Sequence, residues 1–238
     1  MITMIGVRHV VRISEQVSFI VKHTWPDAVL VELDEKRYAS LTDRTSQDVP
    51  GSPSKRPRGL MRNVSDHQNK ASEKNDASDA DEMLVAINTG KAVGAEIICI
   101  DKDAEQVMKE VEENMSFSER TRFSLSLRTD KLSGKKRSSR KQYAADEGSY
   151  MQNMRKKYPT LVEKLVEERN AFMAEKIIAA SEKYKNIVVV VGDVHVKGIC
   201  EMLEGLEIDT IRLAEMMDPE SMSKIRSRIW DRRAEASE

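Results

Sequence analysis

The sequence has 238 residues, and 39 lysines and arginines are balanced by 40 aspartates and glutamates, which leaves a net charge of −1. This balance gives no support to a charge-driven nucleic-acid partner, and no apolar run approaches the roughly 20 residues of a membrane span. Met1 leads directly into an apolar run without the pattern of a signal peptide. We therefore expect a cytoplasmic protein without membrane spans, in which Cys99 and Cys200 are reduced thiols.

Four short apolar runs, rich in β-branched residues, alternate with helical patterns. The runs are almost continuously apolar, which is typical of strands buried on both faces of a parallel sheet. The alternation of strand and helix predicts right-handed βαβ units. The sequence therefore predicts an α/β fold with a mainly parallel sheet flanked by helices. The predicted strands are residues 2–5, 28–31, 97–100 and 187–191, and the longest predicted helix is residues 161–184.

Two polar segments interrupt this pattern, at about residues 42–80 and 132–149. Segments with so few apolar residues cannot offset their ordering entropy by burial, so we predict flexible insertions in a single domain that spans residues 1–238. The second insertion has a basic centre that could contact phosphate, RNA or acidic lipid, but a solvated loop is the more common meaning of such a pattern. A nucleic-acid partner is thus not expected. A C-terminal helix is predicted at about residues 219–236.

The pattern Gly-x-x-His occurs twice, as Gly6 to His9 and as Gly192 to His195. Each copy follows a predicted strand, where a glycine would let the backbone turn sharply. Ligands of open α/β sheets gather where the strands end. We therefore expect both histidines in one site built from the two ends of the chain.

Carboxylates and a guanidinium follow the other predicted strands: Glu32, Asp34 and Arg37 after the second, and Asp101 after the third. Two imidazoles with a carboxylate suit Zn, Mn, Co or Fe, and such a metal can generate hydroxide near neutral pH. Arg37 could neutralise a developing oxyanion. A metal-free site, with a histidine as general base, remains an alternative. For Asp34 taken alone, capping of the following helix is the simpler interpretation.

The sequence resembles the TraB/PrgY family, which is related to the Tiki metalloproteases and to the erythromycin-esterase and ChaN-like superfamily. The resemblance covers both ends and the middle of the chain outside the two polar insertions. It rests on six motifs in order: Gly6-Val7-Arg8-His9, residues 31–38 (VELDEKRY), residues 81–83 (DEM), residues 94–95 and 100–103 (GA and IDKD), residues 168–174 (ERNAFMA) and residues 191–199 (VGDVHVKGI).

The resemblance implies a TraB-like α/β domain and a metal-dependent hydrolase that acts on peptides or small molecules. Carried over by position, His9, Glu32 and His195 would bind the metal, and Glu32, Arg37 and Arg169 would take part in catalysis. Gly6, Asp34, Asp101 and Gly192 would support the site. The alternative is a non-catalytic regulatory protein that binds a peptide or small ligand, as in pheromone shutdown. A homo-oligomer is compatible with either. The chain departs from the family pattern at Arg8, Lys102 and Asp193.

Overall fold

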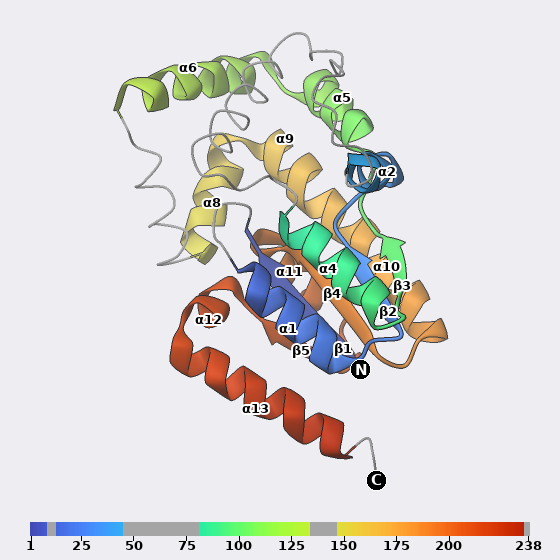
Figure 1. The fold of residues 1–238 in the computed structure, drawn as a ribbon. Coiled ribbons are helices and arrows are strands. Elements are labelled where there is room, and N and C mark those ends of the chain that lie inside the picture. Colours follow the sequence, from blue (N-terminus) through green and yellow to red (C-terminus); the bar gives the residue numbers. More distant parts are fainter. Residues whose placement is uncertain (9–12, 45–80, 134–146, 236–238) are drawn as a thin grey trace. The chain divides into compact units, whose positions relative to one another are not determined.

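The computed structural model describes residues 1–8, 13–44, 81–133 and 147–235. These residues form two compact units. The first unit comprises the described residues up to 103 together with residues 170–235, and the second comprises residues 104–133 and 147–169. Figure 1 shows the chain in sequence colours. His9 and most of both predicted insertions lie outside the described residues.

The first unit is built on a five-stranded sheet with the order β3-β2-β4-β1-β5, in which every pair is parallel. The prediction of a mainly parallel sheet flanked by helices is therefore confirmed. β1 lies between β4 and β5, so the first strand of the chain pairs only with the last two. The strands are β1 (Ile2–Val7), β2 (Ala28–Val31), β3 (Glu96–Cys99), β4 (Ile187–Gly192) and β5 (Ile208–Ile211).

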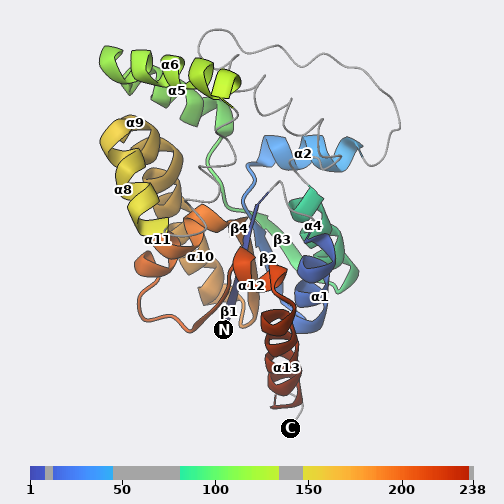
Figure 2. The same ribbon diagram turned by 90° about the vertical axis from the view of Figure 1, so that its left-hand side faces the viewer.

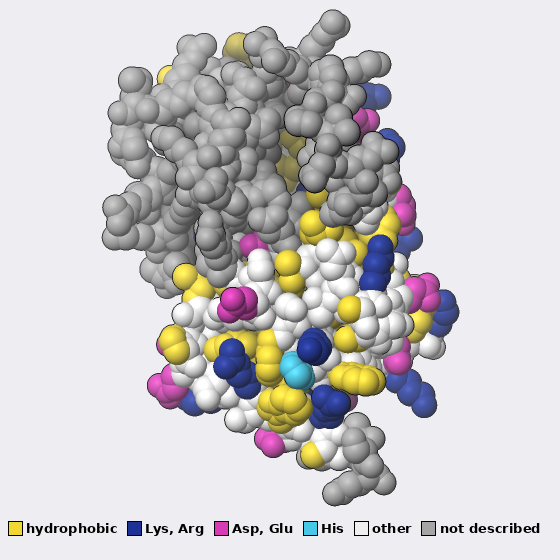
Figure 3. All heavy atoms as spheres, viewed as in Figure 1, with side chains coloured by type: hydrophobic (Ala, Val, Ile, Leu, Met, Phe, Trp, Pro, Cys, Tyr) yellow, Lys and Arg dark blue, Asp and Glu magenta, His cyan; other side chains and the backbone are white. Residues whose placement is uncertain are grey.

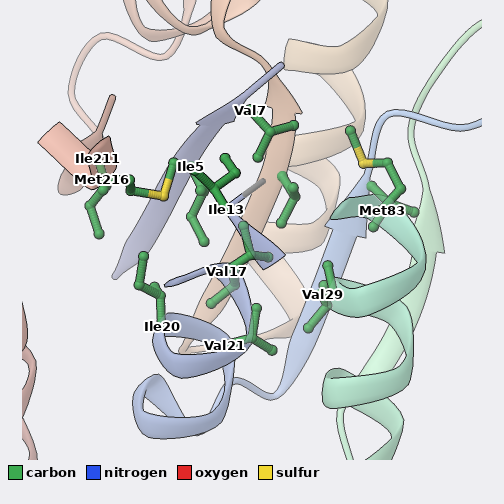
Figure 4. Packing of buried hydrophobic residues seen from close by; sticks show 14 of the residues in the cluster. Ile5, Val7, Ile13, Val17, Ile20, Val21, Val29, Met83, Ile211 and Met216 are labelled. Atoms are coloured by element: carbon green, nitrogen blue, oxygen red, sulfur yellow. The ribbon is translucent and has the colours of Figure 1, made fainter. Parts of the chain in front are cut away.

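Alternate residues of the central strands enter two separate cores, because successive side chains of a strand point to opposite faces. Ile5, Val29 and Val190 enter the core on one face of the sheet, together with helices α1 (Ser14–Thr24), α4 (Asp81–Ala92), α12 (Leu213–Met217) and α13 (Pro219–Glu235). Figure 4 shows this packing, with Val17, Ile20 and Val21 of α1 directed toward the strands.

The opposite face of the sheet is covered by α10 (Glu168–Lys183) and α11 (Asp193–Met202). Met4, Leu30 and Val189 enter this second core, where they meet Met173 and Ile177 of α10. Figure 2 shows α10 and α11 on the other side of the strands from α1 and α4. Helix α2 (Glu35–Arg44) follows β2 after residues 32–34. The sheet is thus buried on both faces, as its continuously apolar strands predict.

The second unit is helical. Its small core contains Val111, Met115, Tyr158 and Leu161. The side chain of Glu119 is buried beside it and accepts hydrogen bonds from the backbone N–H groups of Thr160 and Leu161, at 3.0 and 3.3 Å. These groups are at the start of α9, where a helix lacks internal acceptors. The elements are α5 (Ala104–Asn114), α6 (Phe117–Ser133), α8 (Glu147–Lys157), α9 (Pro159–Val162) and the π-helical segment η1 (Glu163–Glu167).

Three expectations from the sequence need correction. Strand β5 was not predicted, because its two isoleucines are separated by Asp209 and Thr210, and the strand lies at the edge of the sheet with only one neighbouring strand. The single helix predicted over residues 161–184 is divided by η1, after which α10 begins at Glu168. Gly6 lies inside β1, paired with Val191, rather than at a turn after the strand. Among the described residues, no helix has both the length and the apolar character needed to cross a bilayer.

Replacing Glu119 by alanine should lower the free energy of unfolding by about 1–2 kcal/mol, because two N–H groups at the start of α9 lose their acceptor. Thermal or denaturant unfolding followed by circular dichroism measures the change. The matched control is Glu113→Ala, which removes an exposed carboxylate from the same unit and should change the stability by less than about 0.5 kcal/mol. Equal effects of the two substitutions would contradict the capping role of Glu119.

Candidate functional site

The site lies where β4 passes into α11, at the carboxyl end of the sheet. Glu32 directly follows β2, and its backbone N–H still donates to the carbonyl of Val190 on β4, at 3.1 Å. Its carboxylate Oε2 accepts the backbone N–H of Gly192, the last residue of β4, at 2.5 Å. This arrangement places a carboxylate at the N-terminus of α11, where the helix dipole stabilises negative charge.

The second carboxylate oxygen of Glu32 faces the imidazole of His195. His195 is the third residue of α11, and its Nε2 lies 3.5 Å from Oε1 of Glu32. Only 3% of the His195 side chain and 11% of the Glu32 side chain are exposed. Because low-dielectric surroundings strengthen electrostatic interactions, the two groups influence each other strongly. Residues from opposite ends of the chain therefore form one buried pair.

The other nitrogen of the same imidazole is held by Asn170. Nδ1 of His195 lies 2.6 Å from the amide oxygen of Asn170, a buried residue near the start of α10. An amide oxygen only accepts, so this contact requires a proton on Nδ1. Gly198 makes the approach of Asn170 feasible, because a Cβ at that position would lie 2.3 Å from the amide nitrogen. With Nδ1 bound to Asn170, Nε2 is the nitrogen that faces Glu32.

The contact between Nε2 and Glu32 has a chemical consequence. A neutral imidazole with its proton on Nδ1 presents a lone pair to Oε1, and two buried acceptors repel each other unless a proton or a cation lies close to both. The distance of 3.5 Å is too long for a direct hydrogen bond. It matches the roughly 3.4 Å between two ligands of one tetrahedral Zn²⁺ with bonds of about 2.1 Å. The spacing of Glu32 and His195 is thus compatible with two ligands of one divalent metal, with a water-bridged pair, and with an ion pair in which both imidazole nitrogens are protonated.

Asp193, the residue after Gly192, is held by a bidentate ion pair. Nε and Nη2 of Arg212 donate to its two carboxylate oxygens, each at 2.8 Å, and the backbone N–H of Leu213 donates at 3.0 Å. Gly6 makes room for this carboxylate, since a Cβ on Gly6 would lie 2.4 Å from Oδ1 of Asp193. The glycine of the first Gly-x-x-His motif thus packs against the second motif. Its role is close approach rather than the sharp turn expected from the sequence.

The remaining predicted residues fall into different places. Oδ1 of Asp34 accepts the backbone N–H of Arg37 at 2.8 Å, which is the geometry of an N-cap for α2, so the capping interpretation holds for Asp34. Oδ1 of the buried Asp101 accepts the N–H of Lys102, also at 2.8 Å. Arg169 belongs to the second unit, where its guanidinium donates to the carbonyl of Leu165. Catalytic roles for Arg37 and Arg169 stay predictions.

The predicted metal set is His9, Glu32 and His195. Among the residues that the structure describes, no group of three histidine, cysteine or acidic side chains is arranged to hold a metal ion. Glu32 and His195 come together, whereas His9 lies outside the described residues. The structure therefore places two of the three predicted ligands side by side.

Sequence reasoning missed Asn170 and Arg212. Asn170 stands in the motif of residues 168–174, and Gly198 three residues after His195 is the signal of a close contact on α11. Arg212 directly follows β5, the strand that was not predicted, so its place beside Asp193 had no basis in the sequence pattern.

These observations can be compared with known proteins. Residues 2–213 match the family model described as the TraB/PrgY/gumN family. The chain belongs to the TraB/PrgY/gumN family. It is 27% identical over 222 residues to the uncharacterized protein MJ1365 of Methanocaldococcus jannaschii, a match that covers 87% of this chain and 54% of the relative. The chain thus spans about half the length of this relative.

A solved structure with the description "Cofacial heme binding to ChaN of Campylobacter jejuni" aligns with 89% of the present chain. The alignment covers 80% of that chain, with 9% identity and a TM-score of 0.39. A likeness at this level carries no inference about ligands.

Replacing Asp193 by alanine should lower the free energy of unfolding by about 3 kcal/mol, because the mostly buried guanidinium of Arg212 loses both carboxylate acceptors and keeps the backbone carbonyl of residue 193. Denaturant unfolding measures the loss. Asp231→Ala, which removes an exposed carboxylate from α13, is the control and should change the stability by less than about 0.5 kcal/mol. A loss below 1 kcal/mol in Asp193→Ala would show that the ion pair contributes little.

Cys99 should react slowly with thiol reagents. Both cysteines are thiols outside any disulfide, in agreement with the sequence prediction. Burial, and then the negative charges of Glu35 and Asp34, raise the pKa of the Cys99 thiol to about 12. The thiolate is the nucleophile, and a pKa of about 12 in place of 9.0 leaves about a thousandfold less thiolate at a given pH.

Alkylation by iodoacetamide in a Cys200→Ser variant tests this prediction. Cys99 should be modified at least a hundredfold more slowly than a free cysteine under the same conditions, and unfolding in denaturant should restore the ordinary rate. Fast modification of the folded protein would contradict the raised pKa of the Cys99 thiol.

Proposed function

We propose that the protein is a metal-dependent hydrolase of amide or peptide bonds, with His9, Glu32 and His195 as the metal ligands. The proposal is supported above all by the buried pair of Nε2 of His195 and Oε1 of Glu32, which face each other at 3.5 Å, a spacing compatible with two ligands of one metal ion. Membership of the TraB/PrgY/gumN family, together with the resemblance to Tiki metalloproteases, favours a metal ion over a lone proton.

Asn170 orients the imidazole by accepting a hydrogen bond from its Nδ1–H group. This hydrogen bond directs Nε2 toward Glu32. Histidines that bind metals commonly use such a partner to fix the tautomer. The N–H of Gly192 holds the Glu32 carboxylate in place through Oε2, so that Oε1 remains directed at the imidazole. Both groups are therefore pre-organised, and little reorganisation is needed when substrate arrives.

A bound divalent metal would supply a polarised substrate carbonyl and a hydroxide nucleophile near neutral pH. Besides holding the metal, Glu32 is proposed to take part in catalysis as the carboxylate of the site. Arg37 is proposed to stabilise the developing oxyanion. For Arg169, which belongs to the second unit, a catalytic role stays a prediction from the resemblance. The substrate class, peptides or small amides, follows from the resemblance and is part of the proposal.

Elemental analysis of metal-soaked protein, paired with a screen of peptide and ester substrates, tests the proposal. We expect about one divalent metal per chain, its loss in His195→Ala, and a 10- to 100-fold lower metal affinity in Asn170→Ala, because the imidazole loses its orienting acceptor. His23→Ala, which removes a histidine of α1, is the matched control and should retain the metal.

The outcomes separate the alternatives. Hydrolysis that survives a chelator but not the loss of His195 would replace the metal by a histidine general base. Wild-type protein that binds no metal after soaking and hydrolyses no substrate would overturn the proposal in favour of a non-catalytic ligand-binding protein.

A further inference from the structure

A row of aromatic rings and guanidinium groups joins α1 to α13 on the surface of the first unit. The ring of His23 lies between Phe19 and Trp230, with centroids 4.4 and 4.7 Å away. The guanidinium of Arg226 lies 5.1 Å from the Phe19 centroid. We call this row the aromatic–guanidinium stack. Its members are Phe19, His23, Trp25, Arg226, Trp230 and Arg233.

Both tryptophans of the stack are open to solvent, with 61% of Trp25 and 47% of Trp230 exposed. Arg233 lies over both indoles, 5.1 Å from the Trp25 ring and 5.7 Å from the Trp230 ring. Trp25 also has a φ of 48°, a left-handed conformation that is costly for a bulky side chain. Backbone strain of this kind persists where a function or a strong local constraint requires it.

Exposed cations surround the tryptophans, beside one exposed carboxylate, Asp231, which directly follows Trp230. Lys22, Arg226 and Arg233 are exposed residues of α1 and α13 that flank or belong to the stack. Figure 3 shows yellow and dark-blue side chains gathered around one cyan histidine in the region of α1 and α13, with a magenta acidic group at the lower edge of this patch. A cationic surface of this kind is complementary to an anionic partner.

The arrangement of the stack discriminates between anionic partners. The guanidinium groups already cover ring faces on which nucleobases would stack, so the surface is poorly suited to single-stranded nucleic acid. A second copy docked on the same surface would bring like charges together. Exposed indoles beside cations match the headgroup region of a bilayer, where tryptophan is enriched and each lysine or arginine adds attraction to anionic lipid.

We propose that the aromatic–guanidinium stack docks the protein on the surface of a bilayer that contains anionic lipid. The contact is peripheral: Trp25 and Trp230 enter the headgroup layer, and Lys22, Arg226 and Arg233 bind lipid phosphates or carboxylates. This inference is independent of the proposed hydrolase activity, because none of these residues belongs to the Glu32–His195 site.

Co-sedimentation of the full chain with phosphatidylcholine vesicles, with and without phosphatidylserine, tests the proposal. Binding is expected only with phosphatidylserine, accompanied by a blue shift of tryptophan emission and weakened by salt. Trp25→Ala and Trp230→Ala should each lower the affinity at least fivefold. Arg226→Gln should lower it about fivefold, the equivalent of about 1 kcal/mol per cation.

Ile178→Ala is the matched control, since it removes an exposed apolar side chain from α10 on the other face of the sheet. It should leave vesicle binding unchanged. Circular dichroism must show that each variant is folded, and Arg226→Gln retains the test if an indole variant unfolds.

Several results would overturn the proposal: no binding to either vesicle, equal binding to both, or unchanged binding in the folded stack variants. Equal or tighter binding to a single-stranded oligonucleotide or to polyglutamate would assign the surface to a nucleic acid or an acidic protein instead.

Discussion

The hydrogen bond from the N–H of Gly192 to the Glu32 carboxylate is the interaction on which the arrangement of the site depends. It joins the end of β2 to the beginning of α11 and holds one carboxylate oxygen, so that the other faces His195. Asn170 completes the restraint from α10, on the far side of the imidazole. The position of His195 is therefore set by three elements that are separate in the sequence, and its reactive nitrogen is defined by contacts rather than by the motif that contains it.

Two glycines, which have no Cβ atom, leave room for this polar network between closely packed elements. The carboxylate of Asp193 occupies space that any side chain on Gly6 would fill, and the amide of Asn170 does the same at Gly198. Each polar group that enters is then satisfied, Asp193 by Arg212 and Asn170 by His195. Because unsatisfied buried polar groups are costly, the close approach at each glycine depends on the hydrogen bonds that these polar groups make. The buried carboxylate of Asp193 is thus stabilised by its partner Arg212.

Much of the fold followed from the sequence, because β-branched runs buried on both faces carry a strong signal. Residues 28–31 and 187–191 were predicted as strands and lie in β2 and β4. The edge strand β5 has a weaker pattern and was not predicted. The role of Arg212, which directly follows this strand, was therefore not predicted either. For the site, strand topology brought Glu32 and His195 together correctly. It gave no means of finding Asn170, because a contact across the imidazole depends on how α10 packs against α11.

The place of β1 in the sheet has a consequence for how the chain folds. β1 is flanked only by β4 and β5, so residues as distant as Ile2 and Ile187 pair directly. Closing so long a loop costs entropy before any contact repays it, and such non-local topologies fold slowly. During synthesis, the N-terminal strand must wait for the last quarter of the chain, with its apolar residues unpaired in the interval. Assembly of the Glu32–His195 pair is therefore a late event, and the nascent chain is exposed to aggregation or chaperone binding until β4 emerges.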